Sequence, residues 1–398
     1  MSTARPLIDS SRRRALLAAR HLLSPPHRAR TPEQVAGAVV ALHSSDPATV
    51  FLSAAARLEH SDTAALESAL YERQTLVRMH GMRHTLFVLP EELASVVQSS
   101  TTRKVAEKER RMFTAFAAGG GFSPDWLAKV ERLTLAALAD CEQASASRLA
   151  ELVPELREAV PVAVGKPYQS THTIGTRLLR VLGMEGGIVR GRPLGGWTSG
   201  QYRWALRAPL AELPVAEAQA ELVRRWLAAY GPATAEDVRW WTGWGVREVR
   251  AALTACAAAP VRLDVGDGAG DVEGYALPED ADGATDGPEP EPWAALLPGL
   301  DPTPMGWRQR DWFLPAEHRA DLFDRSGNIG PTVWWNGRIV GGWAQRADGE
   351  IVRELLEPVG AEAEAAIDAE SARLAVWLGP VRVTPRFRTP LERRLSSR

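Results

Sequence analysis

Hydrophobic positions in the first third of the chain follow a helical period. Apolar residues recur every three or four positions across 11–30, which predicts an amphipathic helix that Pro25 terminates. Thr31 as N-cap, followed by Pro32, predicts a second helix that reaches Leu42. The next predicted helices cover 48–58 and 62–73.

A strand-like pattern follows these helices. Two β-rich runs flank Gly81 within 75–90, which predicts a hairpin. Helices followed by a hairpin are the order of a winged helix-turn-helix. The same order recurs twice along the chain. The second copy has predicted helices at 124–142, 145–156 and 170–182 and strands at 187–193 and 197–206. The third has helices at 215–230, 231–238 and 246–257 and strands at 261–265 and 274–277.

The C-terminal part has a different pattern. A linker rich in Pro, Asp and Glu covers 283–292, and one helix is predicted over 361–378. Strands are predicted at 307–313, 332–335, 338–345, 350–358 and 381–384. We therefore expect an α+β protein with three tandem winged helix-turn-helix domains and a C-terminal β-barrel-like domain. The expected boundaries are 8–120 (which holds the candidate active-site segment), 121–210, 211–282 and 293–398.

Composition excludes several classes of protein. The chain has 398 residues, no apolar run of transmembrane length and no signal-peptide pattern at its start, so we expect a cytoplasmic protein. Two distant cysteines, Cys141 and Cys256, give neither a disulfide framework nor a Cys-rich zinc site. No phosphate-binding loop or metalloprotease motif is present, and we expect no metal and no cofactor.

The charge balance allows a local basic surface. The net charge of the chain is −2, but acidic residues concentrate at 264–291. This one stretch lowers the net charge of the whole chain without indicating how charge is distributed over the rest. Nearly all positive charge is arginine, whose guanidinium suits phosphates and base edges. Two tryptophan-rich groups, 307–343 and 240–244, are interpreted as core packing, with stacking on bases as the alternative.

His43, Ser45 and Asp46 are the first candidates for chemistry. They lie where the second predicted helix ends, before Pro47, and helix termination alone would explain polar residues there. The functional alternative is that an imidazole, a hydroxyl and a carboxylate on one rigid corner orient and deprotonate a water.

This segment resembles a known family. Leu42-His43-Ser44-Ser45-Asp46, followed by Arg57, resembles the active-site segment of the AlkZ-like DNA glycosylases. Arg83-His84-Thr85 resembles the family's Arg-x-Thr wing, and Asn336-Gly337-Arg338 resembles its last strand pair. The sequence departs from the family at His43 and Ser45, where the family has a Gln-x-Gln or Gln-x-Asp motif.

The resemblance implies a monofunctional glycosylase that excises N7-alkylguanine, including bulky or crosslinked genotoxin adducts, by attack of water at C1′. The partner would be double-stranded DNA carrying the lesion, and the protein would act as a monomer, nucleoid-associated, in DNA repair or in toxin self-resistance. Asp46 could stabilise the developing cation and His43 could activate the water. Residues expected to contact DNA are Arg57, Arg83, Thr85, Arg177, Arg180, Arg190, Arg192 and Arg338.

Two other functions stay open from the sequence. A transcription regulator is one, because winged helices most often serve that role, although three copies in one chain are unusual for it. A catalytically silent lesion-binding protein is the other, because the two family amides at His43 and Ser45 are absent.

Overall fold

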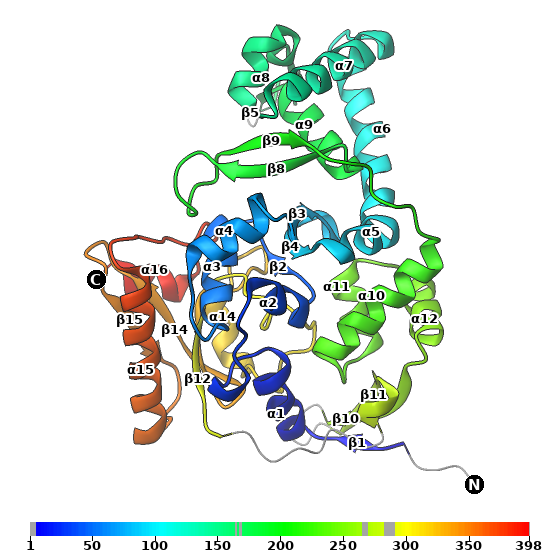
Figure 1. The fold of residues 1–398 in the computed structure, drawn as a ribbon. Coiled ribbons are helices and arrows are strands. Elements are labelled where there is room, and N and C mark those ends of the chain that lie inside the picture. Colours follow the sequence, from blue (N-terminus) through cyan, green and yellow to red (C-terminus); the bar gives the residue numbers. More distant parts are fainter. Residues whose placement is uncertain (1–4, 164, 167–168, 265–269, 282–290, 398) are drawn as a thin grey trace.

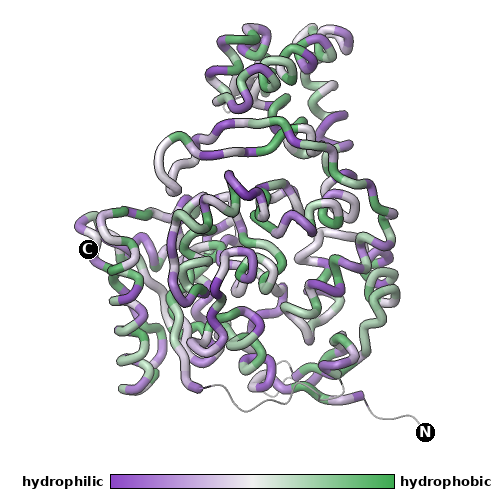
Figure 2. Tube along the Cα trace, viewed as in Figure 1, coloured by the Kyte–Doolittle hydropathy of each residue, from purple (hydrophilic) through white to green (hydrophobic). Residues whose placement is uncertain are grey.

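The computed structural model describes residues 5–163, 165–166, 169–264, 270–281 and 291–397. It has a mixed α+β fold in which three segments each combine helices with a three-stranded sheet (Figure 1). No helix in these ranges combines the length and apolar character that a membrane span requires. Hydrophobic and hydrophilic residues alternate around the helical turns (Figure 2).

The first segment confirms the predicted helices and hairpin. Thr31 caps the second helix together with Gln34, and Asp46 and Asp62 cap the next two through their side chains. Its elements are β1 (Leu7–Ile8), α1 (Ser10–Arg20), α2 (Pro32–Ala38), β2 (Leu42–His43), α3 (Pro47–Ala55), α4 (Thr63–Tyr71), β3 (Leu76–His80) and β4 (Leu86–Pro90).

The second segment projects from the rest of the molecule on a long helix that the sequence analysis missed (Figure 1). The linking elements are α5 (Ala94–Val97), a π-helical turn (Gln98–Thr102) and α6 (Arg103–Gly119). The segment itself has α7 (Pro124–Cys141), β5 (Gln143–Ser145), α8 (Ala146–Leu152), β6 (Ala159–Val162), β7 (Ser170–Thr173), α9 (Ile174–Glu185), β8 (Ile188–Pro193) and β9 (Tyr202–Leu206).

The third segment again confirms its predicted helices and strands. It has α10 (Val215–Tyr230), α11 (Ala235–Thr242), α12 (Val246–Ala255), β10 (Ala259–Asp264), β11 (Asp271–Ala276) and α13 (Pro278–Ala281). Strand β1, from the start of the chain, pairs in parallel with β10 and completes the sheet. The predicted linker at 283–292 lies mostly outside the described residues.

The C-terminal segment is an open sheet, and the expectation of a barrel is wrong for the described residues. Strands β12 (Ala294–Leu297), β13 (Thr332–Trp335), β14 (Arg338–Gln345) and β15 (Ile351–Leu355) form one antiparallel sheet in chain order. Helix α15 (Ala361–Leu378) packs against this sheet, and two short helices complete the segment, α14 (Arg319–Leu322) and α16 (Pro390–Ser396). The runs 307–313 and 381–384 are not strands, although they bury apolar side chains such as Trp307 and Val383. Hydrophobicity alone therefore indicated burial there and not strand pairing.

Another correction concerns the candidate segment. The second helix stops at Ala38, and Val40 takes a positive φ of 63°. Leu42 and His43 then form strand β2, which pairs with Val88 and Phe87 of β4. Pairing with a distant strand replaces the last helical turn that the sequence predicted.

Two main hydrophobic cores hold the fold. One collects the inner side chains of the second segment, from Phe113 to Trp204. The larger one joins the first, third and C-terminal segments, and Trp226, Trp307 and Trp334 are among its largest fully buried side chains. The tryptophan groups are therefore core packing, as the sequence analysis favoured, although Trp240 is only half-buried.

Arg57 is a structural residue, and the expectation that it contacts DNA is wrong for this structure. Its side chain and that of Asp301 are both 0% exposed, and the two form a bidentate ion pair at 2.7 and 2.8 Å. The remaining guanidinium N–H groups donate to the carbonyl oxygens of His21 and Ser53 and to the hydroxyl of Thr303. All five donors are satisfied inside the protein.

We expect Arg57→Ala to lower the free energy of unfolding by about 3–5 kcal/mol, because it leaves the Asp301 carboxylate buried and unpaired. Chemical denaturation measures this loss. The control is Arg224→Ala, which removes an exposed guanidinium paired with Glu221 and should leave stability unchanged. A stable Arg57→Ala protein that had lost DNA affinity would instead restore the DNA-contact role.

Candidate active site and arginine-lined cavity

His43 is held on strand β2 as a neutral imidazole. The residue is 6% exposed, and its ring packs edge-on against Phe87 at 5.2 Å between centroids. Nδ1 accepts a long hydrogen bond of 3.4 Å from the Ser45 amide, so the ring proton is on Nε2. Burial, and to a lesser extent the charge of Arg83, lower the pKa of His43 to about 4.

Asp46 is the N-cap of α3 and holds the segment to the C-terminal region. Its Oδ1 accepts from the amide of Ala48 at 3.1 Å and its Oδ2 from the amide of Arg386 at 2.8 Å. The Arg386 guanidinium also donates to the carbonyl oxygen of Ser45 at 3.3 Å. The carboxylate is therefore fixed in place by backbone amides, and no side-chain cation forms an ion pair with it in the described ranges.

The side chains of His43, Ser45 and Asp46 do not point into one common pocket. His43 lines a small pocket with Arg83, Trp241 and Met305, whereas Asp46 lines another with Trp343 and other residues of the C-terminal segment. Ser45 lies between them, half-buried in the turn. The expectation that imidazole, hydroxyl and carboxylate converge on one water is not met by this geometry.

Arg83 and Thr85 form the turn of the β3–β4 hairpin. Thr85 donates its hydroxyl to the Met82 carbonyl oxygen at 2.6 Å, which stabilises the turn. The Arg83 guanidinium stacks on Trp240 of α11 at 4.0 Å, and a Cβ at Gly243 would come within 3.2 Å of its side chain. Arg83 therefore joins the first segment to the third and borders the His43 pocket.

Several arginines expected to contact DNA have partners within the protein. Arg192 pairs with Glu67 at 2.9 Å and with Glu72 at 3.1 Å, and Arg338 pairs with Glu357 at 3.3 Å. Arg177 stacks on Phe116 at 4.0 Å, and Arg180 lies 3.8 Å from Glu109.

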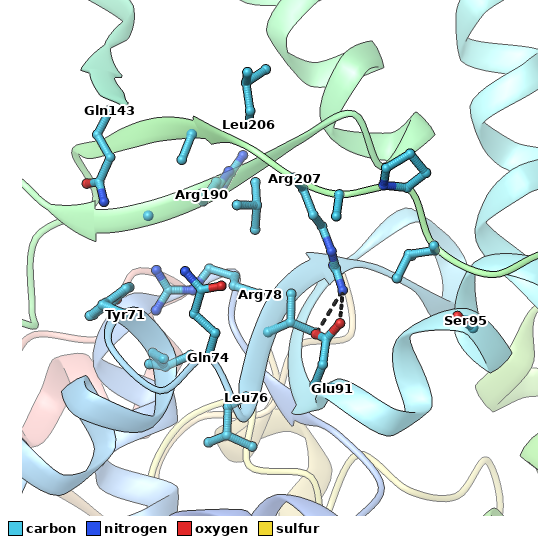
Figure 3. Close-up of a pocket in the computed structure, with 18 of the residues that line it drawn as sticks. Tyr71, Gln74, Leu76, Arg78, Glu91, Ser95, Gln143, Arg190, Leu206 and Arg207 are labelled. Carbon is cyan, nitrogen blue, oxygen red and sulfur yellow. Dashed lines mark hydrogen bonds and ion pairs between the residues drawn. The ribbon is translucent and has the colours of Figure 1, made fainter. Parts of the chain in front are cut away.

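A cavity of about 360 Å³ lies between β3 and the β8–β9 hairpin, and it brings Arg78 and Arg190 together (Figure 3). Sequence reasoning missed Arg78, although an arginine between Val77 and Met79 on a buried strand was a visible signal. Arg190 stacks on Tyr202 of β9 at 4.2 Å.

Sequence reasoning also missed two residues beside this cavity. Arg386 lies close enough to Arg190 to lower its pKa. Burial, together with the charges of Arg190 and Arg180, lowers the pKa of His80 to about 3, so its imidazole is neutral.

Comparisons with known proteins agree with one another. A family model described as DNA glycosylase AlkZ-like matches residues 36–377. Among solved structures, Streptomyces sahachiroi DNA glycosylase AlkZ is similar with a TM-score of 0.70, over 95% of this chain and 99% of that chain. The sequence identity is 20%, so this likeness shows a shared fold. No curated protein sequence matches.

We expect His43→Gln to change how stability depends on pH. The pKa of His43 is lower in the folded protein than in the unfolded chain, so the unfolded chain binds the extra proton as pH falls from about 6.5 to 4. The wild type therefore loses stability over that range, by up to about 3 kcal/mol from this residue, and the glutamine variant lacks this loss. Denaturation curves from pH 4 to 7 measure the difference between the proteins. Parallel pH profiles would contradict a buried neutral His43.

Proposed function

The chain belongs to the AlkZ-like family of DNA glycosylases, and on that premise we propose that it excises N7-alkylguanine from double-stranded DNA. A DNA glycosylase acts in DNA repair by breaking the bond between base and sugar. The proposed substrates are N7-alkylated guanines, with bulky or crosslinked genotoxin adducts foremost. Protection of a producer against its own toxin would be one use of this activity.

The chemistry of the lesion makes modest demands on the protein. Alkylation at N7 places a positive charge on the guanine, which weakens the glycosidic bond. The enzyme then has to stabilise positive charge that develops at the sugar and to supply water at C1′. Neither task needs a lysine nucleophile, a metal or a cofactor.

One observation carries the assignment of Asp46 to the first task. Its carboxylate is fixed by two backbone amides and has no ion-pair partner among the described residues, so its negative charge is not already neutralised. A carboxylate held in that way stabilises a nearby cation without first having to reorganise. We assign Asp46 to the oxocarbenium-like sugar.

His43 and Ser45 complete the proposed site. The neutral imidazole has one donor and one acceptor nitrogen, the same pair of functions as the side-chain amide expected from the family motif. Its Nδ1 accepts from the Ser45 amide, and Arg386 holds the Ser45 carbonyl oxygen. His43 therefore helps to fix the peptide that leads to Asp46, and we assign it this positioning role because it lines a different pocket from Asp46.

We also propose that the three segments of helices and sheet are winged-helix units within the expected boundaries, and that the protein acts as a monomer. Arg83, Thr85, Arg177, Arg180, Arg190, Arg192 and Arg338 remain the proposed DNA-facing set from the sequence. Those already paired with a carboxylate would have to exchange that partner for a phosphate.

The first experiment tests the lesion class. Duplexes carrying a single N7-methylguanine or a bulky N7-guanine adduct are incubated with the protein, and alkali then cleaves the strand at any abasic site. We expect cleavage at the lesion and none in the unmodified duplex. If neither lesion gave scission, the proposed substrate class would be wrong.

The second experiment tests Asp46. Asp46→Asn removes the charge and keeps one oxygen that can cap the helix, but its amide nitrogen cannot accept from the second backbone amide that Asp46 holds. We expect the single-turnover rate of excision to fall about 100-fold or more, whereas the thermal midpoint falls only by the loss of that one hydrogen bond. Asp62→Asn is the matched control, because Asp62 caps α4 through the same type of bond, 2.9 Å to Ala64. Equal rates in the two variants would remove Asp46 from the mechanism.

The third experiment tests His43. His43→Gln supplies the family's amide and should keep most of the activity, whereas His43→Ala should lose it, because only the glutamine retains a hydrogen-bonding group. The same excision assay reads both variants. Full activity in His43→Ala would show that the imidazole has no role.

A further inference from the structure

The cavity under the β8–β9 hairpin contains uncompensated positive charge. Arg78 is 7% exposed, and Arg190 is half-buried above it on β8. Within the described part of the chain neither forms an ion pair, and the buried Nε atom of each has no hydrogen-bond partner. This contrasts with Arg57, whose five donors all have partners.

The other groups around the cavity do not supply the missing negative charge. Glu91 is the carboxylate among its described lining residues, and both of its oxygens accept from Arg207, at 2.7 and 2.8 Å (Figure 3). His80 is neutral, as described above. The nearby Arg180 and Arg386 add further positive charge.

Buried guanidinium groups without an ion-pair partner lower the stability of the folded protein unless an anion binds them. A buried charge without an anionic partner loses its hydration, and the stacking of Arg190 on Tyr202 at 4.2 Å offsets only part of that loss. Burial is the main cause that lowers the pKa of Arg190 to about 10, and the charges of Arg78, Arg386 and Arg180 lower it further. The planar guanidinium matches the oxygen atoms of a phosphate and can bind two of them at once.

We propose that Arg78 and Arg190 form a binding site for one backbone phosphodiester of the DNA strand, beside the His43–Asp46 segment. Arg386 links the two places, because its amide and guanidinium hold Asp46 and Ser45 while its charge faces Arg190. The proposal rests on the glycosylase function above and deepens it. It also excludes this cavity as the pocket for the lesion base, because a cationic N7-alkylguanine would be repelled by the same arginines.

The site is tested first on undamaged DNA, so that the result does not depend on excision. Affinity for a fluorescein-labelled duplex is measured by anisotropy at several salt concentrations for the wild type, Arg78→Gln and Arg190→Gln. Loss of one phosphate contact should reduce the slope of log affinity against log salt by about 0.9. The control is Arg224→Gln, which removes one exposed, paired charge on α10 and should keep the wild-type slope.

A second measurement separates an anion site from a merely structural role and does not use DNA. Inorganic phosphate, compared with chloride at constant ionic strength, should raise the thermal midpoint of the wild type and of Arg224→Gln. It should raise the midpoint of Arg78→Gln and Arg190→Gln less. If replacement of the deeply buried Arg78 prevents folding, the proposal is tested with Arg190→Gln alone, because Arg190 is only half-buried.

Two results would overturn the proposal. One is a salt dependence of DNA affinity in Arg190→Gln that equals that of the wild type. If Arg190→Gln kept this wild-type salt dependence but responded less to phosphate in its thermal midpoint, the site would bind a free anion and not the DNA backbone. The other is an equal response to phosphate in all variants. Failure of the wild type to excise both N7-methylguanine and the bulky N7-guanine adduct would contradict the proposed substrate and leave the phosphate measurements standing.

Discussion

The buried pair of Arg57 and Asp301 is the interaction on which the arrangement of the segments depends. It joins the end of helix α3 to the C-terminal segment, and Thr303 extends it to His21, whose Nε2 contacts the carbonyl oxygen of Ala229 in the third segment at 3.1 Å. Burial, reinforced by the charge of Arg57, lowers the pKa of His21 to about 3 and keeps it neutral beside the pair. Three segments that are distant in sequence are thus held together by one fully satisfied polar network.

The position of the proposed active site follows from that network. Asp46 is the N-cap of α3, and Arg57 follows the C-terminal end of the same helix. Fixing that end against Asp301 fixes the helix, and the amide of Arg386 then holds the Asp46 carboxylate at the other end. The proposed catalytic group therefore lies on a rigid element that is held at both ends, as a site that must be preorganised requires.

The arginines of this protein differ in how their charge is balanced. Arg57 and Arg192 are neutralised by carboxylates, whereas Arg78 and Arg190 are not. A glycosylase must bring polyanionic DNA close to a carboxylate that stabilises a cation. In the proposed arrangement the uncompensated guanidinium groups lie beside Asp46 rather than around it, so that the phosphate and the sugar would each meet a group of opposite charge.

Local signals in the sequence were sufficient for much of the fold. Side-chain caps at Thr31, Asp46 and Asp62 and the hairpin around Gly81 act within a few residues, so reading the sequence located most helices and two of the hairpins closely. The same reading extended the second helix through Leu42 and predicted a strand over 307–313, because hydrophobic spacing reports burial and not which partner is available.

The sequence by itself determined the mixed α+β class of the protein, most of its helices and the family it resembles, and it pointed to the candidate segment at His43–Asp46. Only the tertiary structure decided which charges are balanced. Arg57 and Asp301 are 244 positions apart in the sequence. Strand β1, at the start of the chain, pairs with β10 of the third segment, for example Leu7 with Arg262. Arg57 is part of a core network and Arg78 faces a cavity without a partner, although both are single arginines among apolar neighbours. The physical reason is that charge compensation and solvent access depend on contacts between distant segments, which no local pattern of residues encodes.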